Sequence, residues 1–395
     1  MSHEDRARSP WSTRPLDIPA EIETPALVVD LDIYERNLDE MASICAAAGV
    51  DLFPHTKTHR TVELAMMQLA HGASGLTAAT VTELEAFVAG GAERVLMAFP
   101  LVGDSKVLRV AAAAEQAEVA AAIDSVEGAR AIGALFAGLG RSLDLYLIID
   151  SGLHRVGVEP EDAVAIGKEI DGIEGVNLTG VMTHEGSVYG ADDDDDLVAR
   201  ARAVAELMVG TADALRAAGV SIETVSLGAS ASARTVAGCA GVTQIRPGMY
   251  AFNDLSQVGL GLVDPSRCAA RVAATVISHP AADRACIDAG SKTLSRDPAP
   301  GRKPQELFPG YGAIVGHAGW RIANLSEEHG WLRWVGEGEP TPLSVGQRVQ
   351  IIPNHVCTVF SSAGQSIGLR DGEVVDVWPV IPRGADPFAL PVADS

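Results

Sequence analysis

The sequence predicts an α/β fold in which a TIM-like (β/α)8 barrel is combined with a second, mostly antiparallel β domain. From residue 24 to about 262, short runs that are apolar throughout alternate with Ala-rich amphipathic stretches. This alternation is typical of parallel strands covered by helices on both faces. About eight such units in roughly 230 residues favour a closed barrel over an open sheet. After about residue 262 the helical periodicity fades and β-rich pieces alternate with Gly/Pro turns, which indicates antiparallel strands.

The elements of the first domain follow in order from the apolar runs. Strands are predicted at 26–31, 51–55, 75–80, 94–100, 118–124, 143–150, 176–184, 224–230 and 243–249. Helices are predicted between them, as in "TVELAMMQLAHGA" and "EDAVAIGKEIDGI". The predicted domain ranges are 24–262 for the barrel, and 263–395 together with the N-terminal segment 1–23 for the β domain.

The composition limits the classes of partner. The chain of 395 residues has 52 acidic and 30 basic side chains, a net charge of −22 that disfavours nucleic acid and anionic membranes as partners. No apolar run is long enough to predict a membrane-spanning helix, and the N-terminus has no apolar secretory segment. The five cysteines are widely spaced and include no CxxC pair, which fits a reducing compartment. We therefore expect a cytoplasmic protein.

Polar motifs follow several of the predicted barrel strands. In chain order they are "HTKTHR", "DSGLHRVGV", "THEGSVYG", "SLGASAS" and "RPGMY". The packing of a barrel does not require these polar groups, and the active sites of such barrels lie at the carboxyl ends of the strands. Their repeated placement therefore predicts a single site for a small-molecule substrate at that end of the barrel.

Lys57, in the first of these motifs, is the candidate reactive amine. His55, His59 and Arg60 are expected to raise the positive potential around the amine, and partial burial is expected to lower its pKa. Both influences favour the neutral, nucleophilic form of a lysine, which can form a Schiff base with an aldehyde. The alternative is an ordinary surface lysine at the start of a helix.

Two glycine-containing turns after the last two strands are candidate phosphate sites. Gly228 and Ser230 lie in "SLGASAS" and Gly248 lies in "RPGMY", and such residues let backbone N–H groups approach a phosphate closely. Each motif alone is also compatible with a plain turn, but phosphate sites recur on the final strands of such barrels. A Schiff-base lysine together with a phosphate site indicates pyridoxal phosphate.

The segment "IIPNHVC" contains a candidate metal site. If it is a strand, His355 and Cys357 project from the same face, because side chains alternate between the two faces of a strand. An imidazole and a thiolate are good zinc ligands, and a site with only two protein ligands keeps an open position for water or substrate. The alternative is a chance pair in a buried strand.

The motifs together resemble those of the D-serine dehydratases and D-threonine aldolases, pyridoxal-phosphate enzymes with the alanine-racemase (fold type III) architecture. The resemblance covers nearly the whole chain. It rests on "TPALVVDLDIYERNL", "PHTKTHR", "IDSGLHRVGV", "SLGASAS", "RPGMYAFND", "DAGSKTLSRD", "LSEEHG" and "PNHVC". It implies a homodimer in which the β domain of one subunit closes the barrel mouth of the other.

The resemblance also implies roles for single residues. Lys57 would be the Schiff-base lysine and the base for the substrate Cα proton, and Arg155 would lie beside the cofactor near its phenolic oxygen. His184, at a strand mouth, would either join the cofactor site or merely pack. Arg246 stands where racemases have an arginine facing the pyridine nitrogen, and its role here is left open. The phosphate would be held by Gly228, Ser230, Gly248, Met249 and Tyr250, and a divalent metal, expected to be zinc, by His355 and Cys357.

The implied reaction is the loss of water from a β-hydroxy D-amino acid, and the aminoacrylate left behind hydrolyses to a 2-oxo acid and ammonia. Dehydratase members of the family have Cys at the position of Cys357 whereas aldolase members have Asp, and a thiolate favours zinc. The nearest alternative is retro-aldol cleavage to glycine and an aldehyde, which uses the same residues. An amino-acid racemase and a non-catalytic cofactor carrier are further alternatives, although such carriers lack the β domain and its metal pair.

Overall fold

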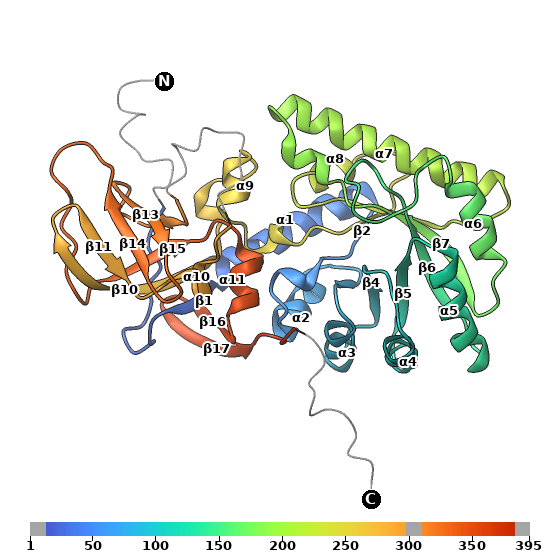
Figure 1. The fold of residues 1–395 in the computed structure, drawn as a ribbon, viewed down its shortest axis with the longest axis horizontal. Helices are drawn as coiled ribbons and strands as arrows, with labels where there is room; N and C mark the ends of the chain where they lie inside the picture. Colours follow the sequence, from blue (N-terminus) through green and yellow to red (C-terminus); the bar gives the residue numbers. More distant parts are fainter. Residues whose placement is uncertain (1–12, 298–309, 384–395) are drawn as a thin grey trace, which may run out of the picture. The chain divides into compact units, whose positions relative to one another are not determined.

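The computed structural model describes residues 13–297 and 310–383, and the chain divides into two compact units (Figure 1). The ranges of the units are Asp39–Gly248 with Ile381–Ser395, and Met1–Leu38 with Met249–Val380. The first contains an eight-stranded parallel sheet and the second a nine-stranded, mostly antiparallel one. The predicted fold class is therefore confirmed.

The barrel unit is formed by eight parallel strands. They are β2 (Asp51–Leu52), β3 (Leu76–Ala78), β4 (Arg94–Met97), β5 (Glu118–Ile123), β6 (Leu143–Ile148), β7 (Val176–Met182), β8 (Thr224–Leu227) and β9 (Gln244–Ile245). Hydrogen bonds join them in the order β2-β9-β8-β7-β6-β5-β4-β3. A parallel bridge between His55 and Thr77 connects the segment after β2 to β3 and closes the ring. The eight strands predicted between residues 51 and 249 are thus confirmed.

Helices alternate with these strands and lie on the outside of the barrel (Figure 1). They are α2 (Val62–Ala70), α3 (Val81–Ala89), α4 (Asp104–Ala113), α5 (Val126–Gly138), α6 (Ala163–Asp171), α7 (Asp194–Ala217) and α8 (Ala233–Val236). Side-chain caps fix several starts, because Thr80, Ser125 and Asp193 accept backbone N–H groups of the first turns of α3, α5 and α7. Over the ranges 13–297 and 310–383, no helix has both the length and the apolar character needed to cross a bilayer.

The β unit contains β1 (Ala26–Asp30), β10 (Ala270–Ala281), β11 (Arg284–Ile287), β12 (Ala313–Ile314), β13 (Trp320–Leu325), β14 (Gly330–Trp334), β15 (Arg348–Ile352), β16 (Gln365–Arg370) and β17 (Glu373–Pro379). Its short helices are α9 (Leu255–Gly259), α10 (Ser291–Leu294) and α11 (Val356–Ser362), and α1 (Leu31–Ala48) follows β1. The sheet has the order β11-β14-β13-β12-β15-β10-β1-β16-β17, with β11 also paired to β10.

The first predicted barrel strand, 26–31, belongs to this β unit. β1 pairs antiparallel with β10 and parallel with β16, so the prediction that it is a barrel strand is wrong. Its apolar run indicates a buried strand but does not specify the sheet that the strand joins. The units consequently differ from the predicted domain ranges, because the chain up to Leu38, within α1, and the segment Met249–Val380 group with the β-rich part.

Candidate active site

Lys57 lies in a short 3-10 helix, η1 (Thr56–Thr58), that follows β2 at the carboxyl end of the barrel. Thr56 and Thr58 are buried, and the Thr56 hydroxyl donates to the Thr77 carbonyl at 2.8 Å. The side chain of Lys57 is exposed between them. The buried threonines thus hold the turn, whereas the partial burial expected of Lys57 is not observed.

The loop after β9 approaches the Lys57 turn closely. The His55 backbone N–H donates to the Pro247 carbonyl at 2.9 Å. A Cβ atom at Gly248 would lie only 2.6 Å from Thr58 Oγ1 and 2.9 Å from the His55 carbonyl oxygen. Position 248 therefore requires glycine for close approach of the two loops.

A cavity of about 340 Å³ opens beside Lys57 at the carboxyl ends of the strands. Its titratable lining residues are His55, Lys57, Asp150, Arg155, His184 and Arg246. The structure thus brings the predicted residues Lys57, Arg155 and His184 together in one cavity. Asp150 and Arg246 join them, and Asp150 was not singled out from the sequence, although it begins the "DSGLHRVGV" motif.

The cavity presents positive charge together with uncharged imidazoles. Burial, followed by the charges of Lys57, Arg246 and Arg155, lowers the pKa of His184 to about 3. Burial and the same kind of neighbouring charge hold the pKa of His55 well below its usual value. Burial lowers the pKa of Arg246 to about 10, which leaves it cationic at neutral pH. The cavity is therefore suited to an anionic ligand.

His59 and Arg60 do not supply the positive potential expected of them. His59 is fully buried with Nε2 3.2 Å from Gln68 Oε1, and burial lowers its pKa to about 4, so the ring is uncharged at neutral pH. Arg60 Nε forms a buried ion pair with Glu83 Oε1 at 3.0 Å. These contacts anchor the segment after Lys57, and the positive charge comes instead from the guanidinium groups of the cavity.

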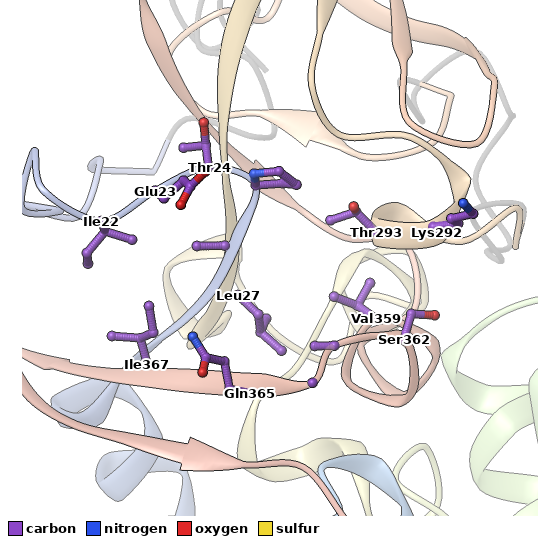
Figure 2. Close-up of a pocket in the computed structure, with 14 residues that line it drawn as sticks. Ile22, Glu23, Thr24, Leu27, Lys292, Thr293, Val359, Ser362, Gln365 and Ile367 are labelled. Carbon is purple, nitrogen blue, oxygen red and sulfur yellow. The ribbon is translucent and has the colours of Figure 1, made fainter. Parts of the chain in front are cut away.

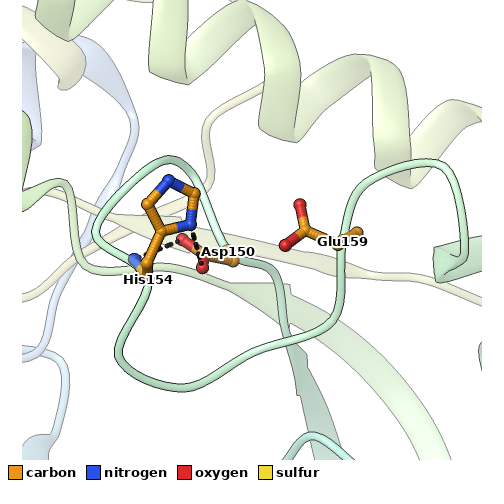
Figure 3. Close-up of side chains that lie close together, drawn as sticks. All are labelled: Asp150, His154 and Glu159. Atoms are coloured by element: carbon orange, nitrogen blue, oxygen red, sulfur yellow. Dashed lines mark hydrogen bonds and ion pairs between the residues drawn. The ribbon is translucent and has the colours of Figure 1, made fainter.

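The loop that carries Arg155 is organised by Asp150. Asp150 Oδ1 accepts the backbone N–H groups of residues 152–154 at 2.9, 3.0 and 3.1 Å. Asp150, His154 and Glu159 each place one possible metal-ligand atom within 4.8 Å of the others. Asp150 Oδ2 already lies 3.1 Å from His154 Nδ1 (Figure 3). We assign this group to the folding of the loop, which places Arg155 at the cavity.

Glu185 organises the turn after β8. Its Oε1 atom accepts the backbone N–H of Gly228 at 2.7 Å and that of Ala229 at 2.9 Å. The Gly228 N–H is thus already bound to a carboxylate, which does not favour its predicted contact with a phosphate. The Gly248 N–H donates to Ser230 Oγ at 3.1 Å and so joins the two predicted phosphate turns.

The other two predicted phosphate residues, Met249 and Tyr250, lie in the 3-10 helix η3 (Met249–Ala251), which belongs to the β unit. Sequence reasoning missed the role of Glu185. The "THEG" motif shows an acidic residue at a strand mouth but not the turn that this residue contacts, 43 positions further along the chain.

His355 and Cys357 lie where β15 passes into α11. His355 precedes the helix and Cys357 is its second residue, so the strand geometry on which their pairing was predicted is wrong. Pro353 directly follows the strand and has no N–H with which to continue it. The side chains of His355 and Cys357 nevertheless share a hydrogen bond. An imidazole and a thiol are therefore adjacent, as expected of two metal ligands.

Asp297 completes this group, and sequence reasoning missed it although it ends the "DAGSKTLSRD" motif. Asp297 Oδ2 lies 2.7 Å from His355 Nδ1. Burial lowers the pKa of His355, but Cys357, Asp254 and Asp297 together raise it to about 9. The surroundings of the imidazole thus favour a positive charge. A carboxylate bound to one ring nitrogen of a histidine is also the usual arrangement around metal-binding histidines.

A second cavity, of about 620 Å³, lies in the β unit (Figure 2). Thr24 and Leu27 form part of its wall, together with Val359 and Ser362 of α11. His355 and Cys357 do not line this cavity. It therefore lies apart from the candidate metal ligands.

Family models match both parts of the chain. The model described as "Alanine racemase, N-terminal domain" matches residues 29–255, and the model described as "Putative serine dehydratase domain" matches residues 269–368. The first match alone spans more than half of the 395 residues. The chain therefore belongs to the alanine racemase-like family, with a second domain of the serine dehydratase type.

Individual relatives align over almost the whole chain. A D-threo-3-hydroxyaspartate dehydratase of Delftia sp. (strain HT23) is 36% identical over 372 residues, 90% of this chain and 97% of the relative. A D-threonine aldolase of Arthrobacter sp. is 30% identical, covering 95% of this chain and 96% of the relative. The structure of a D-threo-3-hydroxyaspartate dehydratase cysteine-to-alanine variant in the metal-free form is similar, with a TM-score of 0.85 and 33% identity; it covers 92% of this chain and 98% of that chain. The suspected family is confirmed.

We predict that His59 makes folding stability depend on pH. Its pKa of about 4 in the folded protein lies below the value of about 6.5 of an unfolded chain, so only the unfolded state gains a proton between these values. Its contribution is therefore present above pH 6.5 and is lost as the pH falls towards 4. Between pH 6.5 and 5, wild type should lose about 2 kcal/mol more than His59→Asn in urea unfolding. Equal losses in the two proteins would contradict the prediction.

Proposed function

We propose that this protein is a pyridoxal-phosphate- and metal-dependent lyase that removes water from β-hydroxy D-amino acids. Hydrolysis of the resulting enamine then gives a 2-oxo acid and ammonia. The observation that carries the proposal is the single cavity that Lys57 shares with Arg155, His184 and Arg246. The chain also aligns almost end to end with a D-threo-3-hydroxyaspartate dehydratase.

The cavity residues fit pyridoxal phosphate. Lys57 provides the primary amine, and Arg155 and Arg246 provide positive charge for the anionic groups of cofactor and substrate. His55 lines the same cavity, and its Nδ1 atom is buried with no hydrogen-bond partner among the described residues. The proposed phosphate turns retain Ser230, Met249 and Tyr250, while Gly228 and Gly248, whose N–H groups already have partners, serve to shape the turns.

Bound pyridoxal phosphate supplies an electron-poor ring that disperses negative charge at the substrate Cα. Lys57 Nζ removes the Cα proton and holds it at the cavity wall. Arg155 and Arg246 orient the anionic groups of cofactor and substrate. His184 is uncharged, so it can accept or donate a hydrogen bond without competing with the arginines for these anionic groups. The pKa of His184 is too low, and Arg246 stays charged, so neither residue is a good base. Proton transfer therefore takes place at Lys57.

His355 and Cys357 fit a divalent metal, and we expect zinc. Imidazole nitrogen and thiolate sulfur are characteristic zinc ligands, and a site with few protein ligands keeps a position open for substrate. A bound metal supplies a Lewis acid for the β-hydroxyl, which is otherwise a poor leaving group. Cys357, where the aldolases of this family have Asp, favours the dehydratase reaction.

The second candidate is the aldolase reaction, which the alignment with a D-threonine aldolase favours. There a base takes the proton of the β-hydroxyl, the Cα–Cβ bond breaks to release an aldehyde, and Cα takes up a proton to give glycine. The same metal ligands serve both reactions, so the two candidates differ in the bond that breaks.

Product analysis separates the two reactions. Purified protein should convert D-serine or D-threo-3-hydroxyaspartate to equal amounts of ammonia and 2-oxo acid, without glycine, and D-threonine serves as the aldolase probe. Lys57→Ala should lower turnover by about a thousandfold or more, and a chelator should abolish it until zinc is restored. Glycine as the main product would establish the aldolase reaction instead, and turnover that persists under chelation would contradict the role of the metal.

We predict that Asp297 orients His355 for metal binding. Asp297→Asn should weaken zinc binding about 10- to 100-fold, because the imidazole loses the carboxylate that fixes its ring. Titration calorimetry with zinc measures this without any substrate. Asp264→Asn, an aspartate that caps the 3-10 helix η4 (Pro265–Arg267), is the matched control and should bind zinc as wild type does. Equal affinities in all three proteins would contradict the role of Asp297.

We propose further that the protein is a homodimer whose subunits share active sites, as the family resemblance implies, and that it is cytoplasmic, as its widely spaced cysteines indicate. A mixture of Lys57→Ala and Cys357→Ala subunits, unfolded and refolded together, should then regain about a quarter of the wild-type activity, because half of the dimers are mixed and each of those has one intact site. Each variant refolded alone is the control. A mixture that remains as inactive as its components would contradict shared sites, and a monomer on sedimentation would contradict the dimer.

A further inference from the structure

A column of buried polar side chains lies inside the barrel unit and ends at Arg246. Arg246 Nε donates to Ser226 Oγ at 2.7 Å, and the Ser226 hydroxyl donates to Gln244 Oε1 at 2.6 Å. The side chain of Gln244 also bonds Tyr146, whose hydroxyl donates to Thr224 Oγ1 at 3.4 Å. The exposed fractions of Ser226, Gln244 and Tyr146 are only 0%, 2% and 9%. These contacts form one continuous chain through β6, β8 and β9.

The two ends of the column reach different cavities. Arg246 lines the cavity that contains Lys57. Tyr146 and Thr224 line a separate cavity of about 450 Å³ at the amino ends of the strands, which also includes Arg94. The column therefore runs along the barrel between its two open ends.

The column is costly in an apolar barrel interior, and the surrounding residues make room for it. Tyr146 packs with Phe53, Leu96 and Met182 in one hydrophobic cluster. A Cβ atom at Gly180 would lie 2.7 Å from Cδ1 of the Tyr146 ring, so glycine on the adjacent strand leaves the space that the ring fills. Polar groups in such a core are destabilising unless each is paired. Each side chain of the column has a polar partner, which satisfies this requirement.

The side chains of the column that contact Arg246 are uncharged, so they do not cancel the charge of its guanidinium. Among the residues that the structure describes, no carboxylate forms an ion pair with its guanidinium, and Glu185 acts on it only at longer range. A carboxylate partner would orient the guanidinium but also cancel its charge. A hydroxyl and the Thr183 carbonyl orient it and leave the charge available to the cavity.

We propose that Tyr146, Gln244 and Ser226 are positioning residues that fix the guanidinium of Arg246 towards the cavity. The fixed orientation makes Arg246 a preorganised positive charge for the anionic occupant of the cavity. The orientation itself follows from the column, whereas its use in holding cofactor or substrate rests on the proposed function.

The orientation can be measured on the protein without cofactor. In ¹⁵N-labelled protein the Nε–H signal of Arg246 is assigned by its loss in Arg246→Lys, and its exchange with solvent is followed. Tyr146→Phe, which keeps the ring, should speed this exchange roughly fivefold, and Ser226→Ala should have a larger effect. Tyr146→Phe should add little in the Ser226→Ala background, because the column is already broken there. Thr211→Val, which removes an equally buried hydroxyl bonded to the Leu207 carbonyl of α7, is the matched control.

The second measurement is the affinity of the same proteins for pyridoxal 5′-phosphate and the absorption maximum of the bound form. The proposal expects affinity to fall roughly fivefold in Tyr146→Phe and not in Thr211→Val. If the Arg246 Nε–H exchanges at the wild-type rate in Tyr146→Phe, the proposal that the column fixes Arg246 is wrong. Faster exchange with unchanged affinity and spectrum would overturn its role at the cavity. Failure of wild type to bind pyridoxal phosphate would instead refute the proposed function, and the exchange result would still decide whether the column positions Arg246.

Discussion

The closure of the barrel at the Lys57 turn is the constraint on which the rest of the site depends. β2 has only two residues, and the ring is completed after it by the bridge between His55 and Thr77. Buried threonine hydroxyls, a loop contact that requires glycine at 248, and the buried Arg60–Glu83 pair all hold this short segment. An exposed amine in a short turn after so short a strand would otherwise be mobile. Because the flanking residues are fixed, the backbone of Lys57 has a defined position at the cavity, which a base that acts on one particular proton requires.

The electrostatics of the cavity follow from burial more than from residue type. Histidines and arginines stand close together in the sequence around Lys57, yet burial leaves His55 and His59 uncharged and pairs Arg60 with Glu83. The cationic groups that face the cavity, Arg155 and Arg246, come from loops far away along the chain. A chain with a net charge of −22 thereby keeps a local positive cavity. Such local charge attracts a small anion even where the whole protein repels large ones.

The sequence allowed the barrel to be predicted strand by strand, because apolar runs at regular spacing report parallel strands directly. It also indicated Lys57 and His184, since strand ends in such a barrel converge on one face, and the family resemblance indicated Arg155. It could not reveal contacts between residues far apart. The sheet joined by 26–31, the bond of Glu185 to the turn 43 residues later and that of Asp297 to His355 58 residues later all depend on tertiary packing. The strand expected at His355 failed for a local reason: Pro353 ends β15, and a helix follows.

The last strands of the barrel show how a core can depart from apolar packing without loss of the fold. "TVSL" and "TQIR" place Ser226, Gln244 and Arg246 on or beside β8 and β9, where a barrel optimised for stability would have branched apolar residues. Each of these polar groups has a partner, so the core tolerates them, but an apolar replacement would relieve their desolvation altogether. Departures of this kind are expected where function constrains the sequence. The polar side chains begin at the wall of the Lys57 cavity and continue through the barrel core. We therefore attribute their presence to the need of the site for a positive charge that is fixed in direction and not cancelled by a carboxylate.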